Sequence, residues 1–215
     1  MKDFLRAESR LLLALAALLI LMNVPYGPYL LYPFKLFSTW VHEMSHGLAA
    51  ILLGGDFVSL KLYADGSGLA YSSRPPNRLA NAFVASAGYN GTALLGMLLL
   101  LARRLPRVGR VGIASLGAAM LLSVLLWVRN PFGVAAVGLI GAGLLIAGLK
   151  AKEEWADLLF AFLAATCSLN AITSIRTLFS SNLVVNGQSV GRSDATSVAE
   201  ALLLPGNRKA ARIAC

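Results

Sequence analysis

The segment YLLYPFKLFSTWVHEMSHGLAAILL, residues Tyr29–Leu53, is an apolar stretch long enough for a membrane helix, and it contains both histidines of the chain. They form the pattern His-Glu-x-x-His with Glu43 between them. At about 100° per residue, a helix places His42 and His46 on one face, one turn apart, so both imidazoles can bind one metal ion. Glu43 lies on the adjoining surface, where it can accept a proton from water at the metal. This spacing predicts a metal site within an apolar helix.

The composition around this segment is that of a membrane protein. The chain has 215 residues, of which 57% are hydrophobic and 13% charged, and its mean hydropathy is +0.70. These values lie far from the soluble globular norm. The net charge of +9 could indicate a nucleic-acid partner, but no basic patch with interleaved aromatic residues accompanies it. Arginines at the ends of apolar segments instead favour anchoring in a lipid bilayer.

Six apolar segments have about the length that a transmembrane helix needs. Gly54-Gly55 ends the second as a helix-stop signal. The first follows basic residues like a signal peptide, but it lacks a small-residue cleavage site, so we expect an uncleaved anchor. The predicted spans are Leu11–Asn23, Tyr29–Leu53, Leu79–Leu101, Val111–Val128, Phe132–Leu149 and Trp155–Ile175.

A short β-hairpin is predicted directly after the second span. Residues Phe57–Ser73 alternate between β-branched or aromatic and polar side chains, and Asp65-Gly66 is a turn signal between the two halves. The segment is too short and too polar to cross a bilayer. We therefore expect an all-α polytopic membrane protein with this hairpin insertion, a single domain over residues 1–215, and a polar C-terminal segment at 178–215.

A catalytic zinc site usually has three protein ligands, so the two histidines need a third residue. No other histidine exists, and the third ligand must be acidic. Turn chemistry accounts for Asp56 and Asp65, and a helix N-terminus accounts for the acidic residues at 153–157. Asp194 precedes an amphipathic segment, Ala195–Leu204, and is either a ligand or a helix N-cap. The acidic residues after the motif are Asp56, Asp65, Glu153, Glu154, Asp157, Asp194 and Glu200.

These motifs together resemble the site-2 protease family of intramembrane zinc metallopeptidases. The chain is similar in particular to a bacterial branch in which the motif continues as His-Gly-Leu-Ala and the next helix opens with Ala-Gly-Tyr-x-Gly. This sequence has His46-Gly47-Leu48-Ala49 and Ala87-Gly88-Tyr89-Asn90-Gly91. In that branch an acidic residue followed by alanine replaces the Leu-Asp-Gly motif of other relatives, and Ser193-Asp194-Ala195 matches that position. The resemblance implies Zn²⁺ held by His42, His46 and Asp194, in a multi-pass protein of the bacterial cytoplasmic (inner) membrane.

The implied reaction is hydrolysis of a peptide bond in a membrane protein substrate. Glu43 would take a proton from the attacking water and deliver it to the leaving amine. Asn90, flanked by glycines, could donate a hydrogen bond to the substrate, or equally to a neighbouring helix. The segment Phe57–Ser73 could hold an unwound substrate as an added strand, or could simply connect two helices.

Two other functions stay open at this level. The chain could be a membrane scaffold that binds zinc without catalysis, although a purely structural pair of histidines does not need Glu43 between them. It could also be a membrane zinc hydrolase that acts on a prenyl or lipid group. The sequence does not specify an oligomeric state.

Overall fold

The structure, a computed structural model, describes residues 2–73, 77–103, 105, 107–173, 182–185, 188–192, 194, 197–198 and 213–214. Six helices lie in this part of the chain, as predicted, and a hairpin follows the second. The helices are α1 (Lys2–Asn23), α2 (Gly27–Leu52), α3 (Arg78–Ala102), α4 (Val108–Leu126), α5 (Pro131–Lys150) and α6 (Glu153–Thr173). The strands are β1 (Phe57–Leu62), β2 (Gly68–Ser72), β3 (Asn182–Val185), β4 (Gln188–Arg192) and β5 (Ile213–Ala214).

Among the described helices, α3, α4 and α5 are long and apolar enough to cross a membrane. The predicted first span, Leu11–Asn23, is the shorter apolar part of α1. The predicted second and sixth spans are the helices α2 and α6, which are less apolar because charged and polar side chains interrupt them. The predicted helical run Ala195–Leu204 lies largely outside the described residues.

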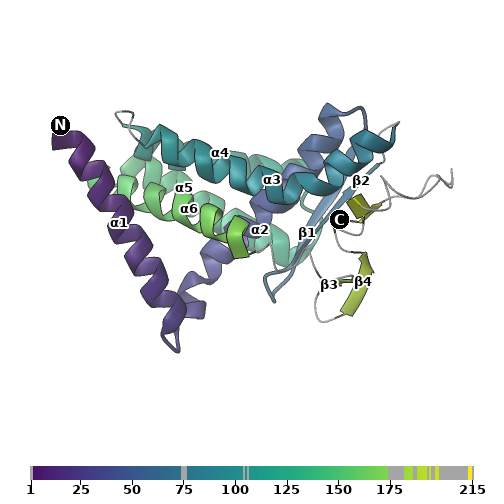
Figure 1. Cartoon of the computed structure of the whole chain (residues 1–215), viewed down its shortest axis with the longest axis horizontal. Helices are drawn as coiled ribbons and strands as arrows, with labels where there is room; N and C mark the ends of the chain where they lie inside the picture. The colour runs from purple at the N-terminus through teal and green to yellow at the C-terminus, as the bar shows by residue number, and fades with distance from the viewer. Residues whose placement is uncertain are drawn as a thin grey trace.

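The helices pack through small residues and a shared apolar core. Figure 1 shows α1 at the end of the molecule opposite the strands, and α1 contacts α6 and α2. Helices α4 and α5 approach so closely at Gly117 that a Cβ there would lie 2.6 Å from the Gly141 carbonyl oxygen. Backbones can approach this closely in a membrane only where side chains are small. Fully buried core side chains include Phe37, Leu60, Ile113, Met120 and Phe160.

The hairpin of β1 and β2 runs back along α2, and the expected turn at Asp65-Gly66 lies between the strands. Gly66 has a φ of +83°, which favours glycine. Three α2 side chains on one face donate hydrogen bonds to consecutive carbonyl groups of the turn. These bonds satisfy three backbone carbonyl groups of the turn that no strand partner pairs. The bonds run from Tyr32 Oη to Ala64 O (2.7 Å), Lys35 Nζ to Asp65 O (2.7 Å) and Thr39 Oγ1 to Gly66 O (2.8 Å).

The outer edge of β1 is covered by the link between α4 and α5. The Leu60 amide donates to Trp127 O at 2.8 Å, and the Arg129 amide donates to Leu60 O at 3.0 Å. The side chain of Asn130 continues this pairing, since its amide group donates to Leu62 O and its Oδ1 accepts from the Leu62 amide. On the other side of the described hairpin, β5 pairs with the end of β2, at Tyr71 and Ser72. The remaining β2 residues, Gly68 to Ala70, are buried and have no strand partner on that side among the described residues.

Candidate metal centre

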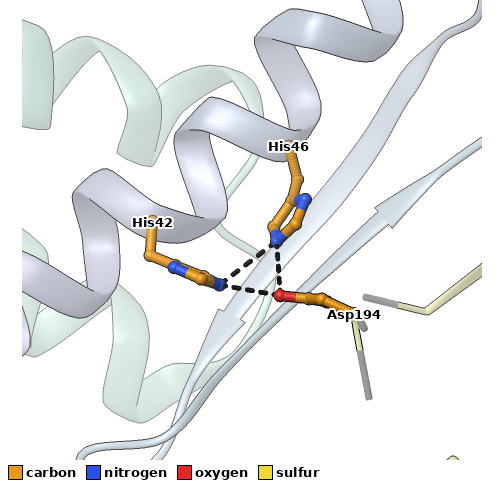
Figure 2. A group of neighbouring side chains, drawn as sticks. All are labelled: His42, His46 and Asp194. Carbon is orange, nitrogen blue, oxygen red and sulfur yellow. Dashed lines mark hydrogen bonds and ion pairs between the residues drawn. The ribbon is translucent and has the colours of Figure 1, made fainter. Parts of the chain in front are cut away.

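His42 and His46 lie on successive turns of α2, and Asp194 approaches them from the segment after β4 (Figure 2). Helix periodicity explains the first two positions. The Nε2 atoms of the two histidines are 3.2 Å apart. Asp194 Oδ2 lies 3.2 Å from His42 Nε2 and 3.3 Å from His46 Nε2. The three ligand atoms therefore form a nearly equilateral triangle.

This triangle has the size that a zinc ion requires. Ligand atoms at about 2.0–2.1 Å from a tetrahedral zinc lie about 3.3 Å from each other. The three measured separations, 3.2, 3.2 and 3.3 Å, match that edge. Together these side chains are a group that could hold a metal ion. The donor set of two imidazoles and one carboxylate leaves a fourth position for water or substrate.

Each histidine ring is also held from outside the triangle. His46 Nδ1 lies 2.7 Å from the carbonyl oxygen of Val84 on α3, so Nδ1 carries the proton and donates it. This leaves the Nε2 lone pair of His46 free to bind a metal. His42 packs edge to face with Tyr89, with ring centroids 4.7 Å apart and ring planes at 76°. Both contacts come from α3, which therefore orients the two imidazoles.

Gly88 leaves the space that a metal ion would need. A Cβ atom at this position would lie 2.4 Å from His42 Nε2 and 2.4 Å from His46 Nε2. Three residues later, a Cβ at Gly91 would lie 2.2 Å from Ser45 Oγ. The glycine spacing thus allows α3 to cross α2 directly at the histidines. In the sequence these two glycines stand out only as part of a family motif, and their Gly-x-x-Gly spacing is the local signal for a close helix crossing.

We expect Gly88→Ala to abolish metal binding, because the added methyl group would occupy the space between the two Nε2 atoms. The measurement is the zinc content of the purified protein by elemental analysis. Gly138→Ala is the matched control, since a Cβ at Gly138 meets no atom within 4 Å. Full zinc content in Gly88→Ala alongside a folded protein would contradict the assignment of this space to the metal.

Glu43 lies beside the triangle, buried between α2 and β2. Only 4% of its surface is exposed. A Cβ at Gly68 of β2 would lie 2.6 Å from Glu43 Cγ, which shows how closely the hairpin covers this side chain. The Ala70 amide donates to the Glu43 carboxylate, whereas Oε2 has no hydrogen-bond partner among the described residues. Because such a group is costly to bury, it is suited to bind a water molecule or a substrate group.

Asp194 is the residue that only the tertiary structure brings to the histidines, 148 positions after His46 in the chain. It is 6% exposed. Burial by itself raises the pKa of its carboxyl group, but the electrostatic influence of the adjacent His46 and His42 outweighs burial and holds the pKa well below its usual range. The carboxylate is therefore ionised, as a metal ligand must be. Its neighbours Ser193 and Ala195 lie outside the described residues.

The fifth predicted site residue, Asn90, lies apart from this group. It is exposed on α3, and its side-chain amide donates to Ser86 Oγ on the preceding turn at 3.2 Å. Gly88 and Tyr89 occupy the surface of α3 that faces the histidines. A contact between Asn90 and substrate stays a prediction.

The relationship of the chain to known proteins agrees with this geometry. A family model described as Peptidase M50B-like matches residues 11–210. The chain belongs to this family. As a Peptidase M50B-like protein it falls within the site-2 protease family of membrane metallopeptidases, as the sequence motifs predicted. No curated protein and no solved structure matches it significantly. The family and the three apolar helices make it an integral membrane protein.

Proposed function

We propose that this M50B-like protein is a zinc-dependent intramembrane protease that hydrolyses peptide bonds of membrane proteins. The observation that carries the proposal is the triangle of His42, His46 and Asp194 with the buried carboxylate of Glu43 beside it. A structural zinc site is normally closed by four protein ligands, whereas three ligands and an adjacent base are the pattern of a hydrolytic site. This argues against a scaffold that binds zinc without catalysis.

The three ligands would hold zinc, which when bound lowers the pKa of water and polarises a carbonyl group. Glu43 performs the proton transfers. It takes a proton from the attacking water while the water oxygen bonds to the scissile carbonyl carbon. When the C–N bond breaks, Glu43 returns the proton to the leaving nitrogen. The hydrogen bond from the Ala70 amide engages the Glu43 carboxylate. Oε2 has no hydrogen-bond partner among the described residues, so it is the oxygen available for these proton transfers.

A substrate helix must be unwound before its peptide bond is exposed, because its amides are bonded within the helix. The β2 edge supports a role in holding the extended form, since its residues Gly68 and Ala70 lie against Glu43. An added strand would satisfy the substrate backbone and place it beside the base. Asn90 is proposed as a further substrate contact because it is exposed on the helix that covers the metal centre.

Family membership and the apolar helices also support a proposal for the partners and the location of this protein. The partners would be the lipid bilayer and a membrane protein substrate, with no nucleic acid. We propose the bacterial cytoplasmic (inner) membrane as the location, a multi-pass arrangement, and one domain for the whole chain.

Reconstitution tests this function. The purified protein is stripped with a chelator, reloaded with zinc, and incubated in detergent with single-span membrane proteins, and new termini are mapped by mass spectrometry. We expect termini within transmembrane segments from the zinc-loaded protein, none from the stripped protein, and recovery on reloading. A zinc-loaded protein that produces no new peptide termini would contradict proteolysis. Release of prenyl or acyl groups from the same mixture would instead identify a hydrolase with a non-peptide substrate.

A further inference from the structure

The outer edge of β2 carries a strand from the far end of the chain. Residues Ile213 and Ala214 form β5, which pairs antiparallel with β2. In this register Ser72 lies opposite Ile213, and Tyr71 lies opposite Ala214. The described sheet therefore has the order β1-β2-β5, with β2 in the centre. Figure 1 shows this short yellow strand beside β2, at the end of the molecule opposite the N-terminus.

The direction of this pairing leads toward the metal centre. Because β5 is antiparallel to β2, each step forward along β5 is a step from Ser72 toward Ala70 and Gly68. Ala70 donates its amide to Glu43, and Gly68 lies against the same side chain. A strand that enters in the orientation of β5 and extends one residue further lies opposite Ala70, and three residues further it lies opposite Gly68, the two positions beside Glu43.

We propose that β5 occupies the position of an incoming substrate strand, so that the protein holds its own C-terminal segment as an intramolecular competitor. The inference rests on the proposed function, because it assumes that substrate adds to β2. The backbone groups of one strand edge pair with one partner at a time. Segments of the same chain compete at effective concentrations commonly on the order of millimolar. Substrates would therefore need to bind the β2 edge better than β5 does, running antiparallel to β2.

The first test opens the edge in the full-length, zinc-loaded protein. Proline lacks a backbone N–H and is poorly tolerated in paired strands, so Ile213→Pro should release β5. The probe is a fluorescent peptide of residues 205–215 with Cys215→Ser, and its binding is followed by fluorescence anisotropy. We expect at least about fivefold tighter binding to Ile213→Pro than to the unaltered protein, the change that one backbone hydrogen bond supports.

Ala210→Pro is the matched control, because position 210 precedes β5. The Ala210→Pro variant should bind the peptide as weakly as the unaltered protein. Zinc content shows that each variant retains the metal centre. Equal peptide binding to all three proteins, or no binding to Ile213→Pro, would overturn the inference. Neither result depends on proteolysis.

The second test locks the edge. In a Cys215→Ser background, Ser72→Cys with Ile213→Cys should form a disulfide, whereas Val58→Cys with Ile213→Cys should not, because Val58 lies on β1. The locked protein should keep zinc and cleave substrate at least about fivefold more slowly, with recovery on reduction. Unchanged cleavage in the locked protein would overturn the inference. If the peptide and disulfide results hold but no variant cleaves any membrane protein, the proposed function fails while the strand competition stands.

Discussion

Replacing Glu43 with glutamine is expected to stop hydrolysis while leaving zinc in place. The amide has nearly the shape of the carboxylate and can still accept from Ala70, but it cannot take a proton from water. Loss of a general base lowers rates by about 10²–10⁴-fold. The measurement is the rate of appearance of new peptide termini, made beside the zinc content of the same preparation. Because Glu43 does not belong to the group of ligand atoms, its replacement should leave about one zinc per chain.

Glu154→Gln is the matched control for this variant. Glu154 is exposed near the start of α6. Its replacement by glutamine removes the same negative charge as Glu43→Gln, at a position far from the histidine motif in the sequence. It should cleave at the unaltered rate. Full activity in Glu43→Gln would defeat the proposal that Glu43 is the base, and loss of zinc from that variant would make it a ligand instead.

Loss of His46 or Asp194 is expected to remove the metal itself. Each contributes one corner of a triangle whose edges are 3.2–3.3 Å, and two remaining ligands do not form a catalytic zinc site. His46→Ala and Asp194→Ala should therefore fall from about one zinc per chain to nearly none by elemental analysis, with complete loss of hydrolysis. The loss of zinc and of hydrolysis in Asp194→Ala should exceed the loss caused by replacing any other acidic residue after the histidine motif.

Asp56→Ala is the matched control for the third ligand. Asp56 was an acidic candidate in the sequence, but it lies at the open end of the hairpin, where its side chain accepts from Ser73 Oγ at 3.3 Å. It should keep its zinc. Zinc retained in Asp194→Ala at the unaltered affinity would place the third ligand elsewhere, and absence of zinc from the unaltered protein under metal-replete conditions would favour a scaffold.

Much of this architecture could be predicted from local pattern. Apolar segments of membrane length predicted six helices, and the alternation around Asp65-Gly66 predicted the hairpin between β1 and β2. The four-residue spacing of His42 and His46 predicted their shared face on α2, since helix geometry alone sets it. All of these signals act over a few residues. The structure reproduces the later five spans within about three residues at each end, whereas α1 begins at Lys2, nine residues before the predicted Leu11.

Other features needed the folded chain. The sequence alone did not single out Lys35, whereas in the structure its ammonium group donates a hydrogen bond to a carbonyl oxygen of the hairpin turn. Gly88 was one glycine of a motif, and its role emerges only where α3 crosses the two histidines. The occupation of the β2 edge by Ile213 and Ala214 joins segments about 140 residues apart. No local pattern encodes such a pairing.

The sequence by itself determined the membrane class, the helical periods and the pair of imidazoles with a carboxylate beside them, because each depends on spacing within one element. The family resemblance pointed to Asp194, but only the tertiary structure shows its carboxylate beside both histidines and shows which strand edge faces Glu43. The chain contains several other carboxylates, and their positions in the sequence do not say which of them lie near the histidines. Packing brought Asp194 to within 3.3 Å of both histidines, and the link between α4 and α5 covered β1 while leaving β2 beside Glu43.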